Sequence, residues 1–209
     1  MPVITKIERQ KRARHRVSIY LDDEFAFGVN DEAVYRHNLK KGMEMSGQLR
    51  EQLEESAGRA DARLVAERFL TSRMRTEREI REKLASKDIR PDIIDETVDA
   101  MKRSRLVDDG LFAEMFVNDR LRFRPRGRAL LQRELRHKGV SADTAMAAVD
   151  AALSEEDEND LAGEMARSYI SRHSGLEGDV LRRRLAAWLQ RRGFPSNTVY
   201  AALRRTFEE

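Results

Sequence analysis

The residues best suited to chemistry in this sequence are arginines that recur at every second position near its centre. An arginine guanidinium is planar, remains charged, and presents a fork of donors that matches a carboxylate or a phosphate. Positions 120–138 hold eight Lys and Arg residues but one acidic residue, Glu134, so few of these cations have an opposite charge one helical turn away. We predict an anion-binding surface whose candidate residues are Arg120, Arg122, Arg124, Arg126 and Arg128 (the central arginines), supported by Arg133 and Lys138.

Two further basic clusters are also suited to bind anions. The expected partner is DNA phosphate or an acidic protein surface. Their candidate residues are Lys11, Arg12 and Arg14, and then Arg182, Arg183, Arg191 and Arg192. A different explanation stands beside each prediction. The first cluster can be a solvated loop that protects a sheet edge from aggregation, and the others can be solvated helix faces.

No arrangement of residues in the sequence indicates catalysis, a metal or a cofactor. Cysteine is absent, which excludes disulfides, thiol catalysis and thiolate-bound zinc. The glycine patterns of phosphate-binding loops are missing, and the four histidines are scattered. Asp108 and Asp109 are adjacent carboxylates, but we interpret them as a junction between helices and a helix cap. The protein is therefore not expected to be an enzyme.

The arginines sit on an internal repeat, visible when the sequence is aligned with itself. Leu84, Leu135 and Leu189 occupy equivalent positions in three similar segments. An amphipathic helix is expected before each (64–73, 111–121 and 161–171), and another follows each with apolar residues spaced by three and four. The pattern predicts three tandem three-helix units, each of which must pack its apolar stripes internally.

Local signals predict how these helices begin and end. Gly139 and Gly193 fit left-handed residues at helix ends, and Asp88 takes the equivalent place in the first unit. Pro125 is expected to end one helix and to leave the later central arginines in an exposed turn. The acidic stretch 154–160 is expected to form an exposed connector, with some of its acidic residues at the N-terminus of the next helix. The stripe residues, including Leu111 and Met115, are expected in the core, and Trp188 is expected to be a packing residue.

The first 57 residues have a different pattern, typical of strands. Residues 3–10 and 17–29 are rich in β-branched and aromatic side chains, with a turn expected at Asp22-Asp23. Alternation places Phe25, Phe27 and Val29 on one face. A brief helix capped by Asp31 and continuing through Leu39, and a second short helix over 46–57, are expected to follow.

Taken together, the fold class is mainly α, with a small N-terminal β-hairpin extension before three tandem three-helix repeats. The expected domains are residues 1–57, 58–106, 107–153 and 154–209, the last of which includes the acidic connector. The sequence is 37% charged and 6% aromatic, which suits narrow apolar stripes. No apolar run approaches the ~20 residues that span a bilayer. We expect a soluble, cytoplasmic monomer.

The sequence resembles the RecX family of bacterial regulatory proteins. The second unit carries the most specific match, in residues 105–113 (RLVDDGLFA) and then Gly127, Leu131, Glu134, Leu135, Lys138, Gly139 and Val140. The first unit matches at Leu70, Arg73, Arg78, Glu79, Lys83 and Leu84. The opening strands, with Thr5-Lys6-Ile7 and Tyr20-Leu21-Asp22, resemble the β extension found in part of the family. Asp88 departs from the glycine of the other units.

The resemblance implies a curved, elongated array that binds the RecA recombinase and lies in the groove of its filament on single-stranded DNA. It further implies inhibition of strand exchange, ATP hydrolysis and co-protease activity, by blocking or disassembling the filament. Two alternatives remain. The protein could be a free-standing DNA-binding protein that uses its basic faces, or a structural adaptor with no role in nucleic-acid binding.

The three separate apolar stripes predict an elongated molecule, because no residues indicate one shared core. A compact chain of this length has a radius of gyration of about 17 Å. We expect small-angle X-ray scattering to give a clearly larger value. A value near that of a compact chain would contradict the prediction.

Overall fold

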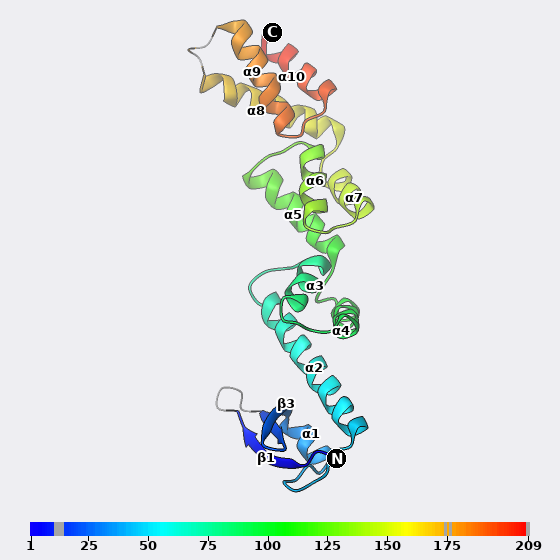
Figure 1. Ribbon diagram of the computed structural model, residues 1–209. Helices are drawn as coiled ribbons and strands as arrows, with labels where there is room; N and C mark the ends of the chain where they lie inside the picture. Colours follow the sequence, from blue (N-terminus) through cyan, green and yellow to red (C-terminus); the bar gives the residue numbers. More distant parts are fainter. Residues whose placement is uncertain (11–14, 174, 176, 208–209) are drawn as a thin grey trace. The chain divides into compact units, whose positions relative to one another are not determined.

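The computed structural model describes residues 1–10, 15–173, 175 and 177–207. In these ranges three strands precede ten helices, as the colours from blue to red follow in Figure 1. The chain divides into two compact units. The first contains residues 1–73 and 81–101, and the second contains residues 74–80 and 102–209. The predicted class, mainly α with a small N-terminal sheet, is confirmed.

The N-terminal sheet has three antiparallel strands in the order β1 (Ile4–Arg9), β2 (Arg16–Leu21) and β3 (Glu24–Asn30). Asp22 and Asp23 join β2 to β3, and both have positive φ angles of 48° and 69°. Positive φ at both central residues is the geometry of the tight hairpin turn, which Asp tolerates. The predicted turn is confirmed.

The side chains of β3 do not alternate between the two faces of the sheet as expected. Ile19 pairs with Phe27 while Tyr20 pairs with Phe25, so Ala26 is an extra residue in a β-bulge. A bulge reverses the facing of side chains on its two sides. Phe27 is therefore buried and Phe25 is exposed, with its ring edge-on to Tyr20 at 5.9 Å between centroids. The expectation that Phe25 shares the buried face was wrong.

The first helix, α1 (Asp31–Arg36), is shorter than expected and is capped by a different residue. Asn30, rather than Asp31, accepts a hydrogen bond from the N–H of Ala33 at 2.8 Å. Asn38 has a positive φ of 48° and ends the helical path before Leu39. Leu39 nevertheless packs in the core of the sheet, in a cluster that includes Ile4 and Ile19.

A single long helix, α2 (Gly47–Leu70), replaces the two helices expected between residues 46 and 73. Gly58 lies within it, and its missing Cβ leaves room for Cδ1 of Ile93. Arg59 donates to Glu96 at 2.7 Å, and the Arg16 guanidinium pairs with Asp61. Helix α2 thus contacts both the sheet and α4. Among the described residues, none of the helices combines the length and the apolar character of a membrane span.

The C-terminal part of α3 and most of α4 complete the first unit. Helix α3 (Glu77–Ala85) is followed by a turn in which Asp88 has the predicted left-handed conformation, with φ of 57°. Helix α4 (Pro91–Arg103) begins at Pro91, where the missing N–H costs nothing. Leu84 and Val98 are fully buried.

The second unit contains two trios of helices, each with a core of its own. The first is α5 (Asp109–Phe123), α6 (Arg128–His137) and α7 (Ala142–Ala152), and the second is α8 (Glu155–Ser171), α9 (Gly178–Arg191) and α10 (Ser196–Phe207). Leu135 and Leu189, which are equivalent in the repeat, are both fully buried. Leu161 packs against both cores and so connects them.

One expectation about burial in this unit was wrong. Leu111 and Met115 are 47% and 55% exposed, because α5 turns Phe112, Ala113 and Val117 towards its core instead. The acidic stretch 154–160 is exposed at residues 154–157, and its acidic residues form the first turn of α8, as expected for part of the stretch. Ser154 caps α8 through the N–H of Asp157, where the acidic residues favour the positive end of the helix dipole.

The two trios dock through glycines that allow backbones to meet. The N–H of Gly127 donates to the carbonyl of Arg192 at 2.9 Å, and the N–H of Ala129 donates to the carbonyl of Gly193 at 3.2 Å. A Cβ on Gly127 would overlap the carbonyl of Gly193, and a Cβ on Gly193 would overlap Leu130. Gly193 also has φ of +87°, so glycine is needed there for both reasons.

The same joint recurs one repeat earlier. The Thr76 hydroxyl, at the position equivalent to Gly127, donates to the carbonyl of Lys138 at 2.6 Å. Gly139 has φ of +95°, and a Cβ there would overlap Arg78. The start of α3 therefore docks on the end of α6 as the start of α6 docks on the end of α9.

Burial of Leu135 predicts a large loss of stability when it is truncated. Leu135→Ala leaves a cavity in a core whose neighbours relax only partly, and we expect a loss of about 2–5 kcal/mol in the free energy of unfolding. Leu111→Ala, on the exposed face of α5, is the matched control, with an expected loss within about 0.5 kcal/mol. Urea denaturation measures both, and equal losses would contradict the assignment of the core.

Candidate anion-binding surface

The central arginines begin at the end of α5, as the sequence predicts. Phe123 is the last residue of α5 and Arg124 caps it, directly before Pro125. Arg122 and Arg124 are exposed, and within the described part of the chain neither has a carboxylate partner. The Arg122 guanidinium lies 5.1 Å from the Phe123 ring centroid. These two arginines are available to a partner.

Two other central arginines share one carboxylate. Glu134 accepts from Nε of Arg120 at 3.1 Å and also pairs with the guanidinium of Arg126. The Arg120 guanidinium also lies 4.4 Å from the Phe116 ring centroid. These groups line a cavity of about 610 Å³ together with Leu130, Arg133, His137 and Lys138. Lys138 is held by Glu79 at 3.4 Å.

Arg128 is committed to contacts inside the protein. Its Nε donates to Glu158 at 2.7 Å, its Nη1 to Asp150 at 2.8 Å and its Nη2 to the carbonyl of Leu153 at 3.0 Å. Glu158 is 1% exposed and also accepts the backbone N–H of Arg128 at 2.7 Å. The hydrogen bond to Glu158 raises the pKa of Arg128. This network indicates a structural role.

The expectation of an exposed turn after Pro125 was therefore wrong for two residues. Arg126 and Arg128 are only partly exposed, because Glu134 and Glu158 bind them. The burial of Glu158 requires such a partner, since an unpaired buried carboxylate is costly.

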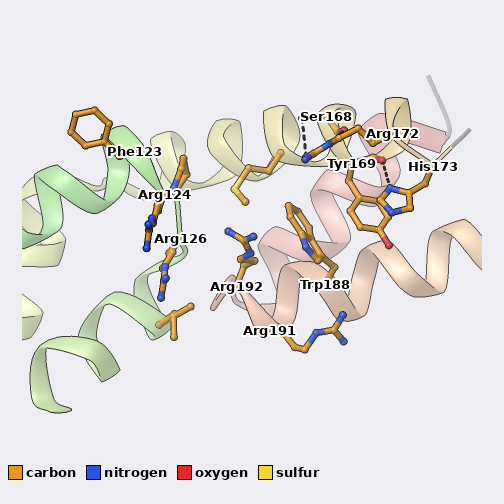
Figure 2. A pocket seen from close by; sticks show the side chains of 13 residues that line it. Phe123, Arg124, Arg126, Ser168, Tyr169, Arg172, His173, Trp188, Arg191 and Arg192 are labelled. Atoms are coloured by element: carbon orange, nitrogen blue, oxygen red, sulfur yellow. Dashed lines mark hydrogen bonds between the residues drawn. The ribbon is translucent and has the colours of Figure 1, made fainter.

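The second basic cluster meets the central arginines at the junction of the two trios (Figure 2). Arg124 and Arg126 line one side of a cavity of about 1030 Å³, and Arg191 and Arg192 at the end of α9 line another. Arg172, at the end of α8, is the fifth arginine of this cavity, which we call the basic hollow. No carboxylate is among the described residues that line it.

The other predicted residues do not join the basic hollow. Arg182 and Arg183 lie earlier on α9, partly buried and exposed respectively. Lys11, Arg12 and Arg14 lie outside the described residues. Whether these five residues bind a partner stays a prediction.

Planar side chains continue the basic hollow along α8 and α9. The Arg192 guanidinium lies 4.9 Å from the Trp188 ring, and Trp188 lies 5.0 Å from Tyr169. Tyr169 in turn stacks on His173 at 4.0 Å and 14° between planes. Figure 2 shows Arg192 between Arg126 and Trp188. The Trp188 and Tyr169 rings are tilted by 41°, so only Tyr169 and His173 are stacked, and we call Arg192, Trp188, Tyr169 and His173 the planar series.

The electrostatics of the basic hollow centre on Arg126. Burial lowers the pKa of Arg126, and the positive charges of Arg120, Arg192 and Arg124 lower it further. Its buried Nε has no hydrogen-bond partner among the described residues. An unsatisfied buried donor costs about 1–3 kcal/mol, so an anion that entered here would relieve both penalties.

Sequence reasoning missed three contributors to the basic hollow. Arg172 and His173 lie in a short segment with no charge pattern of its own, and Tyr169 fits an ordinary core stripe. Trp188 packs against the third core, as the sequence predicts, but it also lines the cavity. Only the fold brings the end of α8 beside the turn after α5.

The adjacent carboxylates at the start of α5 act as helix caps. Asp108 accepts the N–H of Leu111 at 3.0 Å, and Asp109 accepts the N–H of Glu77 at 2.8 Å. Burial raises the pKa of Asp109. Within the described ranges, no group of three or more His, Cys, Asp or Glu residues could hold a metal ion.

The fold and this site define a class of protein: a tandem three-helix repeat protein with an arginine-rich surface. Profiles of the RecX family match almost every part of it. They are the regulatory protein RecX N-terminal domain (residues 2–46) and the first, second and third RecX three-helix domains (62–100, 108–149 and 155–203). The chain belongs to the RecX family.

Individual members of the family are similar in sequence to this chain over nearly its whole length. Regulatory protein RecX of Bacillus velezensis is 32% identical over 99% of this chain and 78% of its own length. That of Clostridium acetobutylicum is 30% identical over 99% of this chain and 97% of its own. A crystal structure of regulatory protein RecX has a TM-score of 0.74 at 25% identity, covering 98% of this chain and 100% of that one. RecX from Lactobacillus salivarius shares the fold, with a TM-score of 0.66.

The contacts of Arg128 predict a stability effect that Arg122 does not share. Arg128→Ala leaves Glu158 buried without its cation, which typically costs about 3–5 kcal/mol. Arg122→Ala, an exposed arginine from the same series, is the control, and we expect a change within about 0.5 kcal/mol. Thermal and urea unfolding measure the difference. A mild effect of Arg128→Ala would mean that the network stabilises the fold little.

Proposed function

We propose that this protein regulates the RecA recombinase. It binds RecA and the RecA filament on single-stranded DNA, and it inhibits recombinase, ATPase and co-protease activities by blocking or disassembling the filament. The observation that carries the proposal is the match to the RecX family in all four of its domains, at about 30% identity over nearly the whole chain.

The geometry fits a regulator that works by binding. The most prominent surface chemistry is a set of arginines, among which Arg122 and Arg124 are exposed and have no carboxylate partner within the described residues. Guanidinium groups of this kind bind carboxylates of an acidic protein surface in a bidentate manner. Regulation of this kind needs no bound cofactor, and a monomer is sufficient for it.

A second candidate function is direct DNA binding without RecA, through the basic faces. The five arginines of the basic hollow, with no carboxylate among its described lining residues, favour it. Phosphate contacts would make such binding strongly dependent on salt, with a slope of about −0.7 per neutralised phosphate on single strands. The two functions are distinguished by the protein concentrations at which inhibition of RecA and binding of DNA begin.

The test of the proposal is ATP hydrolysis by RecA on single-stranded DNA, titrated with this protein. We expect inhibition at or below one molecule per RecA protomer, at concentrations well below those that coat the DNA. DNA affinity measured in parallel without RecA separates the two candidate functions. Unchanged ATPase and strand exchange at several-fold molar excess would rule out RecA regulation.

The exposed arginines give this test a matched pair of variants. Arg122→Glu with Arg124→Glu reverses two unpaired cations, so we expect half-inhibition to need at least tenfold more protein. Arg184→Glu with Arg204→Glu reverses two exposed arginines elsewhere in the same unit and should change inhibition less than twofold. Arg126 is left unchanged because its reversal would set a second carboxylate against Glu134. Equal inhibition by the two variants would remove Arg122 and Arg124 from the site.

A further inference from the structure

A second cavity, of about 610 Å³, lies between α5 and one face of α6. On the α5 side it is lined by Phe116 and Arg120, and Arg126 reaches it from the turn that follows. The residues that α6 and its C-terminal cap contribute have spacings of three and four, which places them on one helix face. They are Leu130, Arg133, Glu134, His137 and Lys138. We call this cavity the α5–α6 groove.

The apolar part of the groove is flat. The Phe116 ring stacks on the ring of Phe112, with 6.0 Å between centroids and 20° between planes. On its other neighbour, the guanidinium of Arg120 lies 4.4 Å from the Phe116 ring centroid. Phe116 and Leu130 are only partly buried, although both are large apolar side chains. A compact ring system bound here would cover them and stack on Phe116.

The groove also has more cations than its carboxylate balances. Glu134 is the one carboxylate among the described residues that line it, and it is shared by Arg120 and Arg126. Arg133 is exposed and has no carboxylate partner in the part of the chain that the structure describes. Burial lowers the pKa of Arg126, and the charge of Arg120 lowers it further. One bound negative charge would reduce this repulsion.

We infer that the α5–α6 groove binds a small organic anion, which has one carboxylate or phosphate group on a compact apolar body. The acid group accepts hydrogen bonds from Arg133 and from Lys138, whose ion pair with Glu79 is long at 3.4 Å. The apolar body lies against Phe116 and Leu130. The volume of the groove is within the ~300–1,000 Å³ range of small-ligand pockets, so a body of one or two fused rings fits.

Glu134 makes the groove selective for a small ligand over a polyanion. Its carboxylate lies among the cations and already occupies Arg120 and Arg126. A chain of phosphates or of acidic side chains would bring further negative charges close to Glu134, whereas a ligand with a single acid group does not. The inference goes beyond RecA regulation, because inhibition of a recombinase through a binding surface needs no small molecule.

The probes for this site are naphthoate and naphthyl phosphate, which carry the same two fused rings with either acid group. The full-length protein, without RecA or DNA, is titrated with each by isothermal titration calorimetry. We expect saturable binding of one ligand per chain. Naphthol, which lacks the acid group, and inorganic phosphate and acetate, which lack the rings, should each bind at least tenfold more weakly. The tighter of the two probes identifies the acid group that the groove prefers.

Two arginines of α6 provide a matched pair of variants. Arg133 and Arg136 are both exposed, but of the two only Arg133 lines the groove. We expect Arg133→Gln to raise the dissociation constant of the tighter probe at least fivefold, and Arg136→Gln to change it less than twofold. Phe116→Leu, which keeps an apolar side chain but removes the ring, should also weaken binding at least threefold. Thermal unfolding checks that each variant remains folded.

Several results would overturn the inference. Naphthol binding as tightly as the acids would show an apolar surface without anion recognition, and inorganic phosphate binding as tightly would show a simple anion site. Equal effects of Arg133→Gln and Arg136→Gln would place the ligand elsewhere. Oligoglutamate that displaced the probes at lower concentration would assign the groove to an acidic protein surface. These measurements contain no RecA, so they can fail while RecA regulation stands, and the reverse also holds.

Discussion

The close docking of α6 on α9 is the constraint from which the candidate site follows. Hydrogen bonds from Gly127 to Arg192 and from Ala129 to Gly193 fix the two backbones, and neither glycine has room for a Cβ. Arg126 precedes Gly127 and Arg192 precedes Gly193, so the docking brings two cations together. Backbone contacts between the two helices therefore place the arginines of the basic hollow side by side. The residues that stabilise the docking are the glycines next to these arginines.

The arginines of this region divide into two roles that their spacing does not reveal. Arg128 neutralises buried Glu158 and bonds the end of α7, which ties the start of α6 to α8. Arg124, at the end of α5, and Arg192, at the end of α9, have no such carboxylate among the described residues. Proteins tolerate local electrostatic conflict where it serves binding, provided that other contacts maintain stability. Here the buried pair and the glycine joint supply those contacts.

Much of the fold is predictable from sequence because its signals are local. The repeat places Leu84, Leu135 and Leu189 alike, and all three are buried at the same point of their trios. Errors arose where distant residues decide. Gly58 lies inside α2 with Cδ1 of Ile93 beside it, and the carboxylate that pairs with Arg128 lies 30 residues away. The basic hollow combines α5, α8 and α9, so no single segment of sequence contains its pattern.

Asp88, Gly139 and Gly193 share a left-handed backbone but differ in what surrounds them. Helix starts dock against the two glycines, whereas Asp88 is exposed, so its side chain costs backbone strain without a steric clash. Glycine therefore stands at this position in the two repeats on which the helix start of another repeat docks, and Asp88 stands in the repeat that lacks such a contact among the described residues. An extra trio inserted ahead of the first repeat would need glycine in place of Asp88.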